Sequence, residues 1–249
     1  MLIIADKRLP GKAKQNLKSF FRRQETEDGG QIVIPEEFNF LELETDGIVY
    51  PAISGHPDIF FCQTPSGLVV SPGLPPNYRV ILSNAGVGFI TGHLASGIRH
   101  PASIHYNAAV NNHYLVHRLE YTDPVILENC HFLKKINVNQ GYTRCNMIWL
   151  KHDRYITSDP GIHRTLYEYG LEGLYVSPEG ILLPGFRNGF IGGTMCVYQN
   201  SVVFTGSLSQ YPEGVRLGNY LVSMNYNIIE LYDGPLVDSG GVIIHPPFF

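Results

Sequence analysis

Short apolar segments alternate with polar ones most clearly between residues 143 and 176. Asn146–Leu150 is an apolar run with one polar member, and 154–157 is rich in aromatic and β-branched residues. Both compositions favour strands, as does the apolar segment 174–176. The polar residues 151–153 fall between the first two segments and predict a turn. This stretch therefore predicts two neighbouring strands followed, after a longer insertion, by a third.

The insertion has the pattern of a helix from Pro160 to Tyr169. Asp159 is a good N-cap, and proline is tolerated in the first helical turn. Gly170 suits the position after a helix that requires a positive φ. The spacing predicts that Ile162, Leu166 and Tyr169 face inward and that His163 and Glu168 face outward. The complete unit is strand, strand, helix, strand.

The same unit recurs along the chain at intervals of roughly 40–50 residues. One unit has predicted strands at 56–63, 68–71 and 87–91. In two others a predicted strand pair is followed by a single strand: 107–118 by 135–138, and 194–206 by 228–232. The predicted helices in these units follow Asp123 and span 215–224, whereas the proline and glycine content of 72–84 argues against a regular helix there. Residues 35–52 are predicted to be a connection and 180–193 a hairpin.

The two ends of the chain each carry part of a unit. Leu2–Ala5 predicts a strand, followed by a helix from Pro10 and a strand at Gln31–Ile34, and Gly241–Ile244 predicts one further strand. Pairing of the terminal strands would complete a fifth unit and remove exposed sheet edges. The pattern predicts an α/β fold, a five-bladed α/β propeller that forms a single domain over residues 1–249. The alternative is an ordinary layered α/β domain whose units resemble one another.

Composition and charge narrow the function classes. The chain has 249 residues, 44% hydrophobic and 16% charged, as expected of a globular protein. A net charge of −4 does not favour nucleic acid, and no apolar run approaches the ~18 residues of a membrane span. The N-terminus has no secretory signal, which predicts a cytoplasmic location with free thiols. The four cysteines lack metal-site spacing, so we expect neither a metal nor a cofactor.

Polar side chains gather where the first strand of each unit starts. In a ring these starts converge on one mouth of a central channel, and convergent polar groups in a concave place form the usual ligand site. The alternative is that they cap turns and satisfy backbone groups. The candidates are His56, Asp58, His105, Asn107, Cys145, Asn146, Thr194, Asp238 and Ser239.

Cys145 is the candidate nucleophile, because it stands at a strand start beside Arg144, which would favour thiolate. Asp58 or Asp238 would hold a guanidinium group, and His56 or His105 would act as base. Strand alternation leaves the direction of Cys145 open, since a one-residue shift presents Arg144 or Asn146 instead. A buried, inert thiol is the alternative. Cys62 and Cys196 lie among aromatic and apolar residues and are expected to be packing residues.

A five-fold ring of such units resembles the pentein superfamily, which includes arginine deiminases, dimethylargininases, amidinotransferases and a ribosome anti-association factor. HPDIFF (56–61) is similar to a motif of the dimethylargininase first repeat. GYTRC (141–145), ITSDPGI (156–162), LPGFRNGFIGG (183–193) and DSGG (238–241) resemble motifs of an uncharacterised bacterial family. Guanidino-modifying penteins carry their nucleophilic Cys in the last repeat, where this chain reads GGVIIHP. That catalytic arrangement cannot be carried over.

Two functions follow from these observations. The clustered Asp, His and Cys favour a protein that binds or hydrolyses a cationic guanidino or amino-acid-like small molecule. If it is an enzyme, the expected activity is that of a Cys-dependent amidinohydrolase or amidinotransferase, with Cys145 reacting with iodoacetamide before the other thiols. The missing last-repeat Cys favours the alternative, a non-catalytic propeller that binds a macromolecular partner.

Overall fold

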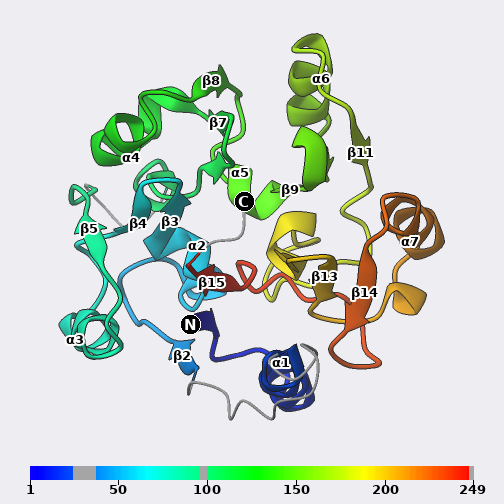
Figure 1. The fold of residues 1–249 in the computed structure, drawn as a ribbon, viewed down its shortest axis with the longest axis horizontal. Coiled ribbons are helices and arrows are strands. Elements are labelled where there is room, and N and C mark those ends of the chain that lie inside the picture. Colours follow the sequence, from blue (N-terminus) through cyan, green and yellow to red (C-terminus); the bar gives the residue numbers. More distant parts are fainter. Residues whose placement is uncertain (25–37, 96–99, 247–249) are drawn as a thin grey trace, which may run out of the picture.

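Five small sheets stand in a ring around a central axis (Figure 1). The computed structural model describes residues 1–24, 38–95 and 100–246. Each sheet has three strands, of which the middle one pairs antiparallel with the first and parallel with the third. Because a parallel connection needs a crossover, a helix joins the middle strand to the third in every blade. The fold is a five-bladed α/β propeller, as the repeated unit predicts.

The blades follow one another along the chain. Blade 1 contains β15 (Ile243–His245), β1 (Leu2–Asp6), α1 (Gly11–Gln24) and β2 (Asn39–Leu43). Blade 2 contains β3 (Phe61–Thr64), β4 (Gly67–Val70), α3 (Pro76–Asn84) and β5 (Phe89–Thr91). Blade 3 contains β6 (Ala109–Val110), β7 (Tyr114–His117), α4 (Pro124–Asn129) and β8 (Lys134–Asn137).

The last two blades repeat the order. Blade 4 contains β9 (Met147–Trp149), β10 (Tyr155–Thr157), α6 (Pro160–Glu168) and β11 (Gly173–Tyr175). Blade 5 contains β12 (Met195–Tyr198), β13 (Ser201–Phe204), α7 (Gly214–Ser223) and β14 (Asn227–Glu230).

The two chain ends close the ring within blade 1. β15 pairs antiparallel with β1, with Leu2 opposite His245 and Ile4 opposite Ile243. This confirms the predicted pairing of the terminal strands. Figure 1 shows the N-terminal β1 and the C-terminal β15 side by side near the axis.

The core lies between the blades, which explains why middle strands are apolar on both faces. In β4, Leu68 and Val70 pack with Leu2 and Ile4 of blade 1, whereas Val69 packs with Leu115 of blade 3. Alternate residues of one strand thus face opposite neighbours. Each blade is held by the two beside it, and the strand starts are fixed around the axis.

Several sequence predictions are wrong in detail. The connection 35–52 contains β2, residues 76–84 form the regular helix α3, and 180–193 forms no hairpin but contributes Leu182 to an isolated bridge with Val237. α3 forms because its prolines precede or open the first turn, where they need donate no hydrogen bond. The expected strand Gln31–Ile34 lies outside the described residues.

The helix α6 fits its prediction in most respects. Its N-cap is Asp159, whose side chain accepts a hydrogen bond from the backbone of Ile162. Ile162 and Leu166 are fully buried, and Glu168 is exposed, as the spacing predicts. His163, expected outside, is half-buried because its ring lies against the hydroxyl of Tyr155.

The end of α6 differs from its prediction at Tyr169. This side chain was expected to face inward, but it is 44% exposed. The helix ends at Glu168, and the chain then turns at Gly170, where φ is +79°. Helical periodicity therefore no longer decides the direction of Tyr169.

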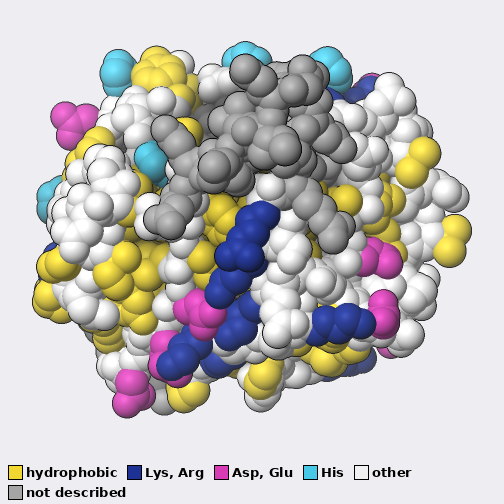
Figure 2. All heavy atoms as spheres, turned by 60° about the horizontal axis from the view of Figure 1, so that its bottom comes forward, with side chains coloured by type: hydrophobic (Ala, Val, Ile, Leu, Met, Phe, Trp, Pro, Cys, Tyr) yellow, Lys and Arg dark blue, Asp and Glu magenta, His cyan; other side chains and the backbone are white. Residues whose placement is uncertain are grey.

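The surface over blade 1 carries paired charges. Lys7 contacts Glu44 at 2.5 Å, and Lys14 contacts Glu42 at 3.0 Å. Figure 2 shows basic side chains next to acidic ones on this face. In the described part of the chain, no helix combines the length and apolar character needed to cross a membrane.

Candidate functional site

Two short helical turns place the candidate residues at the axis. α2 (Pro57–Phe60) carries Asp58 and follows His56, and α5 (Thr143–Asn146) carries Arg144 and Cys145. Each turn directly precedes the first strand of its blade. Residues 56–60 were predicted to be part of a strand, but Pro57 at the first helical position favours a turn. Cys145 likewise lies in a helical turn and not at a strand start.

Asp58, Asn107 and Cys145 form one buried hydrogen-bonded group. The Cys145 thiol donates to Asp58 Oδ2 across 2.8 Å. Asn107 Nδ2 lies 3.2 Å from Cys145 Sγ and 3.0 Å from the carbonyl oxygen of Asp58, and its Oδ1 accepts from the Cys145 backbone N–H. Asn107 therefore fixes the positions of both reactive groups, each of which comes from a different blade.

His56 lies between two carboxylates. Its Nε2 is 4.0 Å from Asp6 Oδ2, and its Nδ1 is 3.9 Å from Asp238 Oδ1. Asp6 is itself paired with Arg8, whereas His56 Nδ1 is buried without a hydrogen-bond partner among the described residues. Burial lowers the pKa of His56, so the imidazole is neutral near pH 7. Its Nδ1 makes no hydrogen bond to the described residues that would compete with a ligand or a water.

Backbone groups hold the Asp238 carboxylate in place. Oδ2 accepts from the N–H of Phe190 at 2.9 Å, and Oδ1 accepts from the N–H of Gly240 at 3.1 Å. Gly193 passes so close that a Cβ there would overlap Asp238 Oδ1. A glycine at this position is thus required by the close approach of the carboxylate.

The two carboxyl groups and the thiol of the cluster are all difficult to ionise in the free protein. Burial raises the pKa of Asp58 to about 6, against an opposing effect of Arg144, and burial also raises the pKa of Asp238. Burial and the two carboxylates raise the pKa of the Cys145 thiol. Within the described part of the chain, Asp58 Oδ1 is buried and has no hydrogen-bond partner. A cation placed beside these groups would favour the ionised form of all three.

A cavity of about 100 Å³ opens above the cluster. His56, Cys145 and Asp238 form its floor, and its walls are largely aromatic and aliphatic: Tyr50, Ile53, Tyr142, Leu183, Phe186 and Phe190. The hydroxyl of Tyr50 donates to that of Tyr142 at 2.8 Å, and the rings of Tyr142 and Phe190 are stacked. One water needs roughly 10–15 Å³, so the cavity admits a group of several heavy atoms.

The donor set also has the spacing of a metal site. One ligand atom each of His56, Asp58 and Cys145 lies within 4.8 Å of the others. Imidazole, carboxylate and thiolate suit zinc-like ions, and a site with three protein donors leaves one position open. The thiol–carboxylate hydrogen bond would have to open to admit the ion.

Sequence comparison places the chain in a family. Residues 34–243 match the family described as "Family of unknown function (DUF6873)". The chain belongs to this family. No curated protein matches it in sequence.

Solved structures with a similar fold include guanidino-modifying enzymes. A dimethylarginine dimethylaminohydrolase variant from Pseudomonas aeruginosa in complex with citrulline has a TM-score of 0.51 at 11% identity, covering 96% of this chain and 92% of that one. An agmatine deiminase from C. jejuni has a TM-score of 0.52 at 10% identity, and the alignment covers 93% of this chain and 87% of that one. An amidinotransferase from Microseira wollei in the saxitoxin pathway has a TM-score of 0.50 at 9% identity, covering 96% and 88%. These similarities establish the pentein fold of the DUF6873 chain.

The structure brings together five of the sequence candidates: His56, Asp58, Asn107, Cys145 and Asp238. Three other candidates donate hydrogen bonds to backbone carbonyls. Asn146 donates to the Tyr142 carbonyl, Thr194 to the Ile191 carbonyl, and Ser239 to the Gly193 carbonyl. These three therefore follow the alternative interpretation, in which polar residues satisfy turns.

His105 and Arg144 lie away from the cavity floor. His105 is only partly buried, and burial lowers its pKa against the charge of Asp123, which belongs to blade 3. The Arg144 side chain lines a different cavity, between the first strands of the blades. The pKa of the Cys145 thiol is raised, so the expected Arg-stabilised thiolate is wrong. The physical reason is that neighbours in a helical turn point in different directions.

Sequence reasoning missed the residues that surround the cluster. Asp6 and Arg8 come from the end of β1 and the turn after it, and the ring-bearing wall residues come from loops: Tyr50, Tyr142, Phe186 and Phe190. The aromatic residues in GYTRC and LPGFRNGF were a usable signal, because exposed loops seldom need so many large rings.

Proposed function

We propose that this cavity binds a small cation of the guanidinium class and that Cys145 is the nucleophile toward its central carbon. The observation that carries the proposal is the pair of buried carboxylates, with Asp238 on the cavity floor and Asp58 hydrogen-bonded behind Cys145. Within the described residues neither carboxylate pairs with a Lys or Arg side chain. Two such carboxylates repel each other, so the free site favours a cationic occupant over a neutral or anionic one.

The shape of the cavity supports a planar cation. A guanidinium presents several N–H donors in one plane, which suits the oxygens of Asp238, while Asp58 adds its charge from behind Cys145. Tyr50, Tyr142 and Phe190 line the walls, and aromatic faces attract cations. The small volume admits the head group, while Phe186, 53% exposed, lies where a longer tail would leave the cavity.

The same geometry supports amidine hydrolysis. Asp58 Oδ2 takes the thiol proton across the 2.8 Å hydrogen bond, and Cys145 Sγ forms a bond to the guanidinium carbon. Asp58 returns that proton to one nitrogen, the C–N bond breaks, and ammonia or an amine leaves. A positively charged thiouronium then links the substrate to Cys145.

Water completes the cycle with His56 as base. The neutral imidazole accepts a proton from water through Nδ1, and the oxygen adds to the thiouronium carbon. The C–S bond breaks, the thiol recovers a proton from the new hydroxyl, and a urea is released. His56 then releases its proton to solvent, where the ammonia that left in the first step is protonated. In the balanced reaction, a guanidinium and water give a urea and an ammonium ion.

Product analysis tests the proposal. Purified protein would be incubated with agmatine, arginine and N-methylated arginines, and ureido products would be measured by mass spectrometry. Wild type and Cys196→Ser should form product, since Cys196 lies in a strand away from the cavity floor, and Cys145→Ser should form none. Product formation by Cys145→Ser would refute the nucleophile. Absence of both binding and product with every cation would favour the macromolecular-partner hypothesis instead.

A further inference from the structure

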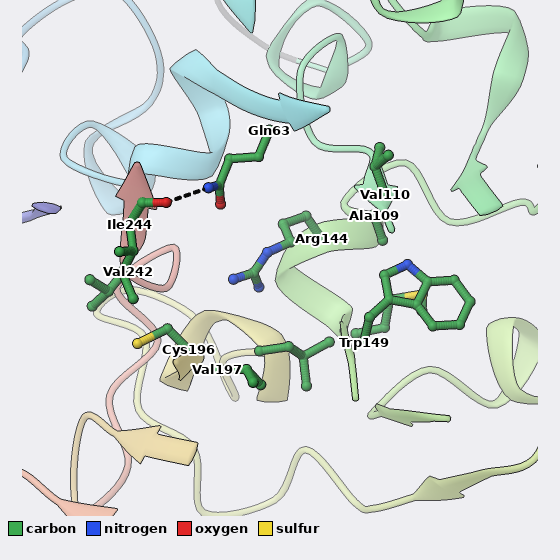
Figure 3. A pocket seen from close by; sticks show the side chains of 11 residues that line it. Gln63, Ala109, Val110, Arg144, Trp149, Cys196, Val197, Val242 and Ile244 are labelled. Carbon is green, nitrogen blue, oxygen red and sulfur yellow. Dashed lines mark hydrogen bonds between the residues drawn. The ribbon is translucent and has the colours of Figure 1, made fainter. Parts of the chain in front are cut away.

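Arg144 occupies the central channel itself. A second cavity, of about 90 Å³, is lined by the first strands of all five blades, through Gln63, Val110, Ile148, Val197 and Ile244. Figure 3 shows the guanidinium of Arg144 extending into this space between the strands. Cys145, the next residue, lines the cavity with the carboxylates instead. The α5 turn thus presents one residue to each cavity.

The Arg144 guanidinium has donors to spare. Nη1 donates to the carbonyl oxygen of Gly192 at 2.8 Å. Within residues 1–24, 38–95 and 100–246, no carboxylate oxygen lies within 4 Å of it, and Nε and Nη2 make no hydrogen bond. A guanidinium that lines a cavity with most of its five N–H groups unused is a ready anion site.

Trp149 also lines this cavity, with its ring turned away from Arg144 (Figure 3). The indole N–H of Trp149 is buried and has no hydrogen-bond partner in the described part of the chain. The amide of Gln63 is partly used, since Nε2 donates to the Ile244 carbonyl at 2.6 Å (Figure 3). The remaining walls are mostly apolar, with Val110 and Val197 among them.

We propose that this channel cavity binds a small monocarboxylate with an apolar body, held by Arg144 through a two-point contact. The planar fork of guanidinium matches the two oxygens of a carboxylate. A single positive charge among apolar walls balances one negative charge, whereas a doubly charged phosphate or sulfate would lose its hydration with only half its charge matched. A larger hollow of about 530 Å³ adjoins the channel cavity, and Trp149 and Val197 line both. The apolar body of the acid fits against these two side chains.

The proposal does not depend on the guanidinium site. Arg144 also acts on Asp58 across the α5 turn, where its charge favours the ionised carboxylate. A purely structural Arg144 would serve that role alone and would bind no added acid. Saturable binding of a carboxylate separates the two descriptions.

The experiment is a calorimetric titration with butyrate, using acetate, butyramide and sulfate as matched probes. Butyrate should bind with 1:1 stoichiometry, and acetate about tenfold more weakly, because each buried methylene contributes roughly a factor of three to four. Butyramide, which lacks the charge, and sulfate, which is doubly charged, should bind at least about tenfold more weakly than butyrate. Cys145→Ser should leave butyrate binding unchanged, so the outcome is independent of the guanidinium site.

Variants assign the contact. Arg144→Met should abolish butyrate binding, and Arg144→Lys should weaken it because a point charge replaces the fork. Trp149→Phe should weaken it because a smaller ring offers less apolar surface to the body of the acid. If Arg144→Met does not fold, the Lys and Phe variants decide. The proposal is overturned if butyramide or sulfate binds as tightly as butyrate, if wild type binds no butyrate, or if folded Arg144 and Trp149 variants all keep wild-type affinity.

Discussion

The Asp58→Asn substitution should change how the stability of the free protein depends on pH. The Asp58 carboxyl is buried, and its pKa is raised from 3.8 to about 6 by that burial. A carboxyl whose pKa is higher in the folded state binds its proton more tightly there. It therefore contributes stability that is fully present below pH 3.8 and is lost as the pH rises through about 6.

The size of the effect follows from the same two values. The interval between 3.8 and about 6 corresponds to about 3 kcal/mol, at about 1.36 kcal/mol for each pH unit. Between about pH 4 and pH 7.5, the free energy of unfolding of wild type should fall by up to about 3 kcal/mol more than that of Asp58→Asn. Comparing the two pH dependences, and not the absolute stabilities, cancels the effect of the substitution on packing.

Urea melts of both proteins at intervals of about half a pH unit provide the measurement. Asp153→Asn is a matched control, because Asp153 lies at the surface, where it pairs with His113. Its unfolding free energies over the same pH range show how much the same chemical change alters the curve outside the buried cluster. Parallel curves for wild type and Asp58→Asn would show that the Asp58 carboxyl behind Cys145 is well solvated, and a cationic occupant would lose its main support.

Three further outcomes test the packing and the site. Leu166→Ala should lower the free energy of unfolding by roughly 2–5 kcal/mol in denaturant melts, because Leu166 is fully buried. Tyr167→Ala, at a 73% exposed position, should lower it by under about 0.5 kcal/mol, and equal losses would contradict the assigned helix face. Cys145 in the ligand-free protein should react with iodoacetamide more slowly near pH 7 than after unfolding, since the thiol is buried and its pKa is raised; fast labelling would contradict that environment. Gly193→Ala should displace Asp238 and weaken guanidinium binding at least about tenfold, and unchanged affinity would show that Asp238 makes no contact with the ligand.

The ring could be predicted because its signals are local and repeated. Middle strands such as β4 are apolar on both faces, helices follow recognisable starts such as Asp159-Pro160, and the half-units at the chain ends complete each other. The third strand of blade 1, β2 at Asn39–Leu43, mixes polar and apolar residues and was not predicted, because its pairing with β1 brings together distant parts of the chain.

The site could be predicted only in part, because its geometry depends on two four-residue turns. A strand at 56–61 or at 145–146 would present alternate residues to one side, whereas a helical turn sends Arg144 and Cys145 to separate cavities. The aromatic walls come from loops that have no counterpart in the repeated unit. Side-chain contacts such as that between Asn107 and Cys145 join different blades and leave no mark in local sequence.

We propose that the Asp58 and Asp238 carboxylates favour binding of a guanidinium-class cation in the cavity. Calorimetric titration of metal-free protein with methylguanidinium at about pH 7.5, beside the neutral isostere methylurea, tests it most directly. We expect 1:1 binding of methylguanidinium to wild type and Cys145→Ser, at least about tenfold weaker binding to Asp58→Asn, and no measurable binding of methylurea. Equal affinity for the charged and neutral molecules, or full affinity in Asp58→Asn, would contradict it.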